Sequence, residues 1–165
     1  MDTLEARLLL ALCADPRATV SALAQDLGVT RNTVQARLAG LFERGVVRSF
    51  ERSIDPAAIG FPLSAYVTVE VTQRRLDEVA AALATIPEVV EVIGLSGPTD
   101  LLVAVVARDA DDLYRIAGQI LATPDVQRTQ TSLAMRQLVP HRLAPLLRAR
   151  AGQPRGARTA ATGTT

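Results

Sequence analysis

The spacing of apolar residues changes along this chain from a helical period to a strand period. Leu4, Leu8 and Leu12 recur at every fourth position, which places them on one face of a helix. In residues 64–71 apolar and polar residues alternate instead, which is typical of a strand with one covered face. The two patterns need different packing partners, so the sequence predicts two small domains joined by a Pro- and Gly-containing linker over residues 55–63.

Residues 1–54 are expected to form the first domain, a helix-turn-helix followed by a wing. Thr19 and Thr30 are typical N-caps of two successive helices. Gly28 lies between these helices and permits a left-handed backbone angle at little cost. Residues 46–50 are interpreted as a strand that folds back as a small wing. The pattern indicates DNA binding, and a plain helical hairpin with a polar outer face is the alternative.

The second of these helices begins with side chains of the kinds that read DNA. Arginine pairs with guanine, and asparagine or glutamine pairs with adenine. The N-terminus of a helix also favours a phosphate group. We expect the leading residues to meet bases and the arginines further along to meet phosphate. The predicted DNA-binding residues are Thr30, Arg31, Asn32, Thr33, Gln35, Arg37, Arg48 and Arg52.

Residues 64–147 are expected to form a second domain with the element order βαββαβ. Strands are predicted over residues 64–71, 89–95, 101–107 and 126–135, and helices over 76–83 and 113–120. This order predicts a ferredoxin-like sheet with two helices on one face, and therefore the α+β fold class. Residues 83–89 and 121–126 echo one another, because each segment ends a helix and opens a strand, as two βαβ halves would.

Charge is distributed unevenly among these regions. All 18 basic residues are arginine. Residues 1–52 hold 7 arginines and 6 acidic residues, residues 53–139 hold 6 and 11, and residues 140–165 hold 5 and none. Residues 148–165 are rich in Arg, Ala, Gly and Thr without an apolar period, so we expect a disordered basic tail. That tail would either attract DNA non-specifically or simply keep the protein in solution.

The sequence gives no sign of catalytic or metal chemistry. It has no Ser/His/Asp spacing, no Gly-rich phosphate loop and no cluster of metal ligands, so we expect no enzyme activity, cofactor or metal. No N-terminal stretch resembles a signal peptide, and no apolar run is long enough to span a membrane. A cytoplasmic protein without a membrane partner is therefore expected.

A series of ordered motifs over residues 2–139 resembles the Lrp/AsnC (feast/famine) family of transcriptional regulators. The motifs are Thr19-x-x-x-Leu23-Ala24, Gly28-Val29-Thr30-x-x-Thr33-Val34-x-x-Arg37-Leu38, Leu41-x-x-x-Gly45-Val46-Val47, Asp55-Pro56-x-x-x-Gly60, Pro87-Glu88-Val89, Gly97-x-x-Asp100 and Pro124-x-Val126-x-x-Thr129-x-Thr131. The resemblance implies a winged helix-turn-helix, a ferredoxin-like regulatory (RAM) domain, and dimers that pair their sheets and often form octamers. It also implies that a small effector, an amino acid bound near the Gly-x-x-Asp turn, modulates assembly or DNA affinity.

The expected effector site is the turn over residues 96–100. A free amino acid needs an anionic or carbonyl group for its ammonium and N–H or hydroxyl donors for its carboxylate. The turn offers hydroxyls, an acidic side chain and a glycine that permits close approach, although Pro98 removes one N–H donor. The resemblance places the last strand beside it. The expected effector residues are Ser96, Gly97, Thr99, Asp100, Thr131 and Ser132, and the alternative is an ordinary tight turn in which backbone amides satisfy Asp100.

Two other functions and one alternative assembly compete with this interpretation. An architectural protein would bind DNA with little specificity. Sirohaem decarboxylases resemble the same two-domain architecture, but they use His and aromatic or basic residues around a tetrapyrrole, and His141 is the only histidine here. For assembly, residues 101–106 are apolar on both faces, so we expect a dimer as the smallest stable unit. The alternative is a monomer with this strand central in its own sheet.

Overall fold

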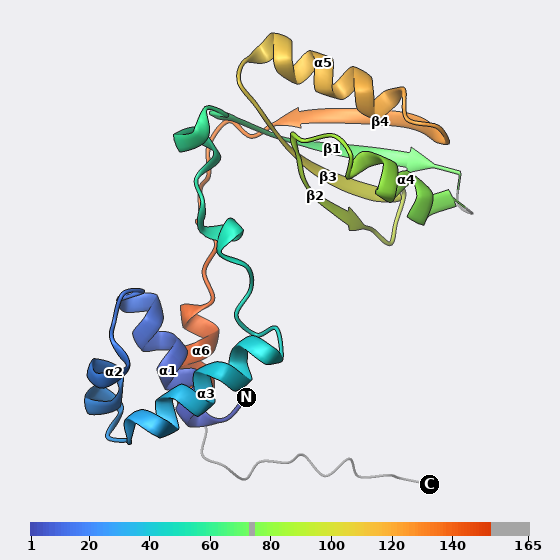
Figure 1. The fold of residues 1–165 in the computed structure, drawn as a ribbon. Coiled ribbons are helices and arrows are strands. Elements are labelled where there is room, and N and C mark those ends of the chain that lie inside the picture. The colour runs from blue at the N-terminus through green and yellow to red at the C-terminus, as the bar shows by residue number, and fades with distance from the viewer. Residues whose placement is uncertain (73–74, 153–165) are drawn as a thin grey trace, which may run out of the picture. The chain divides into compact units, whose positions relative to one another are not determined.

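The computed structural model describes residues 1–72 and 75–152, which fold as two compact units. The helical unit contains residues 1–52 and the chain from residue 139 onward, and the sheet unit contains residues 53–138 (Figure 1). The expected second domain, 64–147, therefore differs from the observed division at its C-terminal end. Its last residues belong to the helical unit, because the chain returns to that unit after the sheet.

Three helices build the first part of the helical unit. They are α1 (Thr3–Ala14), α2 (Val20–Leu27) and α3 (Arg31–Glu43). A capping box begins α1, because the side chain of Asp2 accepts the Glu5 N–H and the side chain of Glu5 accepts the Asp2 N–H. The three helices enclose one apolar cluster of buried residues, which comprises Leu8, Leu23, Ala24, Leu27, Val34 and Leu41.

The turn between α2 and α3 depends on Gly28. Its φ of +67° lies in the left-handed region, which disfavours other residues. The next residue, Val29, donates its N–H to the carbonyl of Ala24 at 3.0 Å and so ends α2. Thr30 then caps α3. This geometry confirms the helix-turn-helix that the sequence predicts.

The expected wing is not formed. In the described chain, residues 44–62 contain no strand, and two 3₁₀ helices, η1 (Phe50–Ser53) and η2 (Pro56–Ile59), follow the turn after α3 instead. A strand needs a neighbour for its backbone hydrogen bonds, and the chain provides none here. Phe50 is accordingly 79% exposed. The prediction of a strand over residues 46–50 is therefore wrong for the single chain that the structure describes.

A sixth helix, α6 (Ala144–Ala151), completes the helical unit by packing against α1. Leu147 is buried in this contact, and the guanidinium of Arg150 donates to the carbonyl oxygen of Met1 at 3.1 Å. The expectation of disorder from residue 148 onward is therefore wrong for residues 148–151. They complete the helix that Leu147 anchors. Residues 153–165 of the expected tail lie outside the described residues.

The sheet unit has the predicted βαββαβ order. Its elements are β1 (Leu63–Val71), α4 (Leu76–Leu83), β2 (Val89–Gly94), β3 (Leu101–Ala107), α5 (Ala110–Leu121) and β4 (Val126–Leu133). The strands form one sheet in the order β2-β3-β1-β4, and every neighbouring pair is antiparallel. This is the ferredoxin-like arrangement, and it confirms the α+β class.

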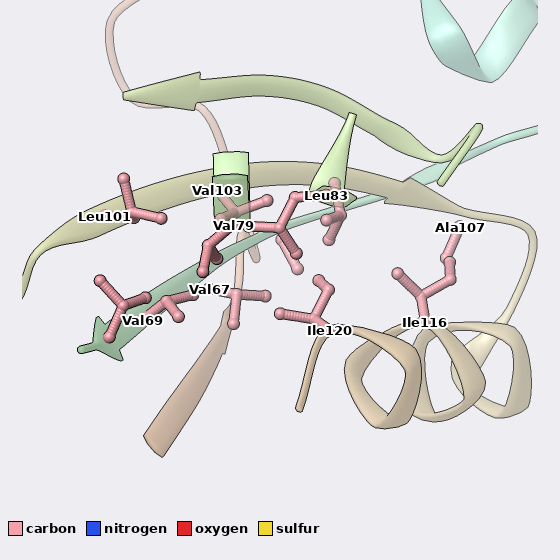
Figure 2. Packing of buried hydrophobic residues seen from close by; sticks show 12 residues of the cluster. Val67, Val69, Val79, Leu83, Leu101, Val103, Ala107, Ile116 and Ile120 are labelled. Carbon is pink, nitrogen blue, oxygen red and sulfur yellow. The ribbon is translucent and has the colours of Figure 1, made fainter. Parts of the chain in front are cut away.

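Both helices of the sheet unit pack on one face of the sheet. Alternate residues of β1 and β3 point toward them, as with Val67, which pairs with Val103 (Figure 2). Ile116 and Ile120 of α5 and Val79 and Leu83 of α4 belong to the same buried cluster. The other face, which carries Tyr66, is covered by no helix of the described sheet unit, because both helices are used on the inner face.

Candidate nucleic-acid interface and effector site

The start of α3 presents a polar surface to the outside of the helical unit. Arg31, Asn32 and Gln35 are exposed, whereas Val34 and Leu41 are buried against the other helices. Because a helix has 3.6 residues per turn, burial of one side leaves the opposite side free. This free side carries the arginine, asparagine and glutamine that suit base edges in the major groove.

Two threonines fix where this surface begins. The hydroxyl of Thr30 accepts the N–H of Thr33 at 3.2 Å, and the two hydroxyl oxygens lie 2.9 Å apart. The pair therefore caps α3 and holds its first turn rigid. Both threonines were predicted to bind DNA. The structure places them beside the three exposed polar residues but gives their hydroxyls a capping role first.

Arg37 faces a different neighbourhood from the other predicted contacts. Its Nη1 lies 2.9 Å from Oδ2 of Asp2 and 3.4 Å from Oε1 of Glu5. Glu5 also accepts a 2.7 Å hydrogen bond from Arg44. Two acidic side chains of the α1 N-terminus thus neutralise Arg37 and Arg44. The structure ties Arg37 to α1 rather than bringing it to the free side of α3.

Glu5 is the centre of this ionic cluster, and its side chain is only 6% exposed. Burial alone would raise the pKa of the Glu5 carboxyl. The backbone N–H of Asp2 and the guanidinium of Arg44 stabilise the carboxylate instead, and the pKa is lowered overall. Glu5 therefore stays charged and links α1 to α3.

Arg48 and Arg52 lie in the segment that follows α3, where a wing was expected. Both are exposed, and Arg52 lies within η1. Since this segment forms no strand, it does not present the two arginines as a wing would. The structure therefore brings Arg31, Asn32 and Gln35 together on one helix and places Arg48 and Arg52 outside that helix.

The predicted effector turn is built around Asp100. Its side-chain Oδ2 accepts the N–H of Val71 at 2.9 Å, and its backbone N–H donates to Val69 at 3.0 Å. The pairing of β1 with β4 is irregular between Glu70 and Val71, so the carboxylate of Asp100 supplies an acceptor at this irregular point. One backbone amide, that of Val71, therefore bonds the Asp100 side chain, as the alternative of an ordinary tight turn expects.

The rest of the turn remains open. Ser96 and Gly97 are exposed, and Thr99 is half-buried. Gly97 has a φ of +147°, which other residues rarely adopt, so the turn requires glycine at this position. These residues retain the polar groups and the accessible backbone that a small ligand would need.

The predicted partners on the last strand lie further away than expected. Thr131 pairs with Val67 and Ser132 with Tyr66, whereas the turn contacts β1 at Val69. Thr131 and Ser132 are also adjacent in a strand, so their side chains point to opposite faces of the sheet. The structure does not bring these two residues to the turn, because the register of β4 places Thr129 there instead.

A small hollow lies beside the turn on the sheet. It has a volume of about 80 Å³, and its lining residues are Thr68, Glu70, Thr99, Arg128, Thr129 and Gln130. Nη1 of Arg128 lies 3.9 Å from Oε1 of Glu70, so the hollow carries one charge of each sign. Of the six lining residues, only Thr99 was among the predicted effector residues, so sequence reasoning missed the five strand residues of the hollow. The register of β1 against β4 was the missing information.

The size of the hollow limits what one chain can do with it. Ligand sites in proteins usually measure roughly 300–1,000 Å³. A hollow of about 80 Å³ holds only part of a ligand, so further walls are needed for a complete site.

Comparison with known proteins identifies both units by sequence. Residues 1–41 match the AsnC-type helix-turn-helix domain, and residues 64–144 match the Lrp/AsnC ligand binding domain. The HTH-type transcriptional regulator AldR of Mycolicibacterium smegmatis is 38% identical over 142 residues, which cover 84% of this chain and 83% of the relative. The relative is named as a transcriptional regulator, and both matching domains are described as parts of Lrp/AsnC-type regulators rather than enzymes. The decarboxylase alternative is therefore set aside.

Solved structures show the same fold. Escherichia coli AsnC matches with a TM-score of 0.79 at 20% identity, over 88% of this chain and 99% of that structure. A Neisseria meningitidis transcriptional regulator, solved as a complex with L-Met, matches with a TM-score of 0.74 at 22% identity, over 84% and 92% of the two chains. Within the described residues, no helix is both long and apolar enough to cross a membrane.

Proposed function

The chain belongs to the Lrp/AsnC family of transcriptional regulators, and on that premise we propose that α3 reads duplex DNA in the cytoplasm while an amino-acid effector modulates DNA affinity or assembly. The observation that carries the DNA half is the free side of α3, where Arg31, Asn32 and Gln35 are exposed together. Side chains of these types discriminate base pairs by hydrogen bonds in the major groove.

The remaining predicted contacts take supporting roles in this proposal. Thr30 and Thr33 hold the first turn of α3 and offer their hydroxyls to the DNA backbone. Arg48 and Arg52, in the segment after α3, bind phosphate. Arg37 joins α3 to α1 through Asp2 and is assigned to stability instead.

A selection from random-sequence duplexes tests the DNA half. Wild-type protein should enrich a preferred sequence, and Asn32→Ala should weaken binding to it by about 1–3 kcal/mol and relax the preference at one position. Gln137→Ala removes an exposed amide outside α3 and should leave binding unchanged. Enrichment of no sequence by the wild type would favour the architectural alternative over a specific regulator.

The effector half of the proposal concerns the hollow beside the 96–100 turn. A free amino acid is a zwitterion, and Glu70 and Arg128 offer a charge for each of its ends. Thr99 adds a hydroxyl, and the exposed Ser96 and Gly97 lie in the same turn. The L-Met complex of the Neisseria regulator supports this class of ligand. A neighbouring subunit would supply the walls that one chain lacks.

A thermal-shift screen of the standard amino acids tests this half. At least one of them should raise the melting temperature of the wild type, and Arg128→Ala should abolish that shift. Arg136→Ala removes an equal charge elsewhere in the sheet unit and should preserve it. A ligand that stabilises Arg128→Ala as strongly as the wild type would place the effector elsewhere, and no response at all would contradict the effector proposal.

For assembly, we propose that the uncovered face of the sheet pairs with a second copy, in a dimer that assembles further into octamers. Tyr66 on this face is 49% exposed and Ile93 is 42% exposed, while Leu102 and Ala104 lie half-buried between them. Ala104→Arg should therefore yield monomers by light scattering. Ala81→Arg places the same charge on the exposed side of α4 and should leave the dimer intact. A wild type of one chain mass would contradict the proposal.

A further inference from the structure

The two units of the chain carry opposite charge. The helical unit, counted over residues 1–52 and 139–165, holds 12 arginines and 6 acidic residues. The sheet unit holds 6 arginines and 11 acidic residues. Of the 12 arginines, 5 come from the returning segment after residue 138, which contains no acidic residue. The return of the chain therefore moves positive charge onto the unit that carries α3.

Helix α6 holds this segment firmly on the helical unit. Ala6 is fully buried, yet it does not belong to the apolar cluster enclosed by the first three helices. By helical spacing, Ala6 lies on the side of α1 turned away from Leu4 and Leu8, and α6 packs against α1. Leu147 supplies the buried apolar residue of α6. Of the two helices in this contact, α1 lies within the matched segment 1–41, whereas α6 extends beyond the other matched segment, which ends at residue 144.

The position of α6 relates it to α3. Arg150 bonds the carbonyl of Met1, and the adjacent residue, Asp2, pairs with Arg37 of α3. The C-terminal end of α6 is thus connected to α3 through the first two residues of the chain. Arg37 and Arg44 are already neutralised by Glu5 and Asp2, so this flank of α3 has lost cationic character.

Two arginines of the segment after residue 138 carry a charge that no acidic residue of the described chain pairs with. Arg142 and Arg148 are exposed, and neither forms an ion pair with any residue in the described part of the chain. They lie before α6 and within it, on a scaffold fixed to α1. The surroundings contain no acidic residue from the same segment to compete for them.

We propose that Arg142 and Arg148 form a second contact with DNA, directed at the phosphate backbone beside the site that α3 reads. The inference rests on the proposed DNA-binding function and extends it to the returning segment. Guanidinium groups bind phosphate by charge-assisted hydrogen bonds, independently of base sequence. A different role for Arg148 is to complement the negative end of the α6 dipole, which would affect stability and leave DNA binding alone.

The experiment compares the salt dependence of binding to a mixed-sequence duplex. Each phosphate contact contributes about 0.9 to the slope of log affinity against log salt. The double variant Arg142→Ala/Arg148→Ala should therefore lose about 1.8 from the slope per bound protomer and bind several-fold more weakly at low salt. The matched control, Arg75→Ala/Arg136→Ala, removes the same charge from the sheet unit and should keep the wild-type slope.

The outcomes separate this inference from the function on which it rests. An unchanged slope in Arg142→Ala/Arg148→Ala, with or without a lower melting temperature, would overturn the second contact. An equal loss of slope in both double variants would also overturn it, because only overall charge would then matter. Failure of the α3 assignment would instead be seen in the selection from random-sequence duplexes, as a sequence preference that Asn32→Ala does not alter.

Discussion

The helical and sheet units stabilise themselves in different ways. The sheet unit encloses 12 buried apolar residues between two helices and a four-stranded sheet. The apolar cluster of the helical unit has 6 buried residues, and ionic contacts of Glu5 and the docking of α6 add to it. A small core leaves more surface for recognition but makes each supporting contact matter more. DNA recognition thus lies on the unit with the smaller core.

The largest effect on stability is expected from a substitution that creates a cavity in the core of the sheet unit. Ile116 is fully buried, so Ile116→Ala should reduce the free energy of unfolding by about 2–5 kcal/mol. Hydrogen-exchange mass spectrometry would report the two units separately, and protection should fall in the sheet unit. Leu121→Ala, at a residue that is 51% exposed on the same helix, should have little effect.

The next test removes the apolar anchor of α6. Leu147→Ala should cost roughly 2 kcal/mol, because it withdraws three buried carbon atoms. Faster exchange should appear in α1 and α6 and not in the sheet unit. Leu146→Ala is the matched control, since that neighbour is 68% exposed. Equal effects of the two substitutions would mean that α6 does not dock on α1 in solution.

A smaller effect is expected from the ionic cluster. Glu5→Gln keeps the shape of the side chain and removes its charge, so the bonds from Arg37 and Arg44 weaken. Both arginines are more than a third exposed, and solvent screening limits the loss to about 1 kcal/mol at neutral pH. Chemical denaturation would measure it. Glu43→Gln, on an exposed side chain of α3, should be neutral by comparison.

The smallest effect is a difference in acid sensitivity between the units. The backbone N–H of Arg108 and the guanidinium of Arg115 hold the pKa of Asp112 well below its usual range, whereas the pKa of Glu5 is also lowered but against the cost of burial. A carboxyl with a lowered pKa in the folded state stabilises above its unfolded pKa, and the contribution is lost as pH falls through the folded pKa.

Hydrogen exchange measured between about pH 5 and pH 2, the range in which carboxyls titrate, would test this difference. The stability that Glu5 contributes to the helical unit should be lost as the pH falls below the ordinary value of 4.5 toward the lowered pKa of Glu5. Asp112 should continue to stabilise the sheet unit at lower pH. Asp112→Asn should reduce the loss of stability of the sheet unit at acidic pH and leave that of the helical unit unchanged. An unchanged loss in that variant would contradict the role assigned to Asp112.

Much of the fold follows from the sequence where structure depends on near neighbours. The alternation in β1 and the stripe of α5 identified their elements, because each residue's burial follows from its place in a repeating pattern. Gly28 and the two threonine caps identified the helix-turn-helix for the same reason. The free side of α3 could also be predicted, since a helix with one buried side presents the other.

The errors occurred where distant parts of the chain meet. Arg37 pairs with an acidic residue 32 positions away, and no local pattern indicates that partner. The pairing of β4 with β1 decides that Thr129, rather than Thr131, lies beside the turn. The wing required a neighbouring strand that the chain does not provide. For α6, the apolar residues on several sides of α1 were a usable signal, because a helix that is apolar on more than one side needs more than one cover.

The docking of α6 on α1 also has a consequence for biosynthesis. A ribosome makes α1 first and α6 after the whole sheet unit, and domains generally fold as they emerge. The sheet unit can assemble from one uninterrupted stretch of chain, whereas the helical unit must wait for its final segment. A nascent or prematurely terminated polypeptide would therefore carry the helix-turn-helix with one side of α1 uncovered. A complete helical unit would therefore form only after the sheet unit has been synthesised.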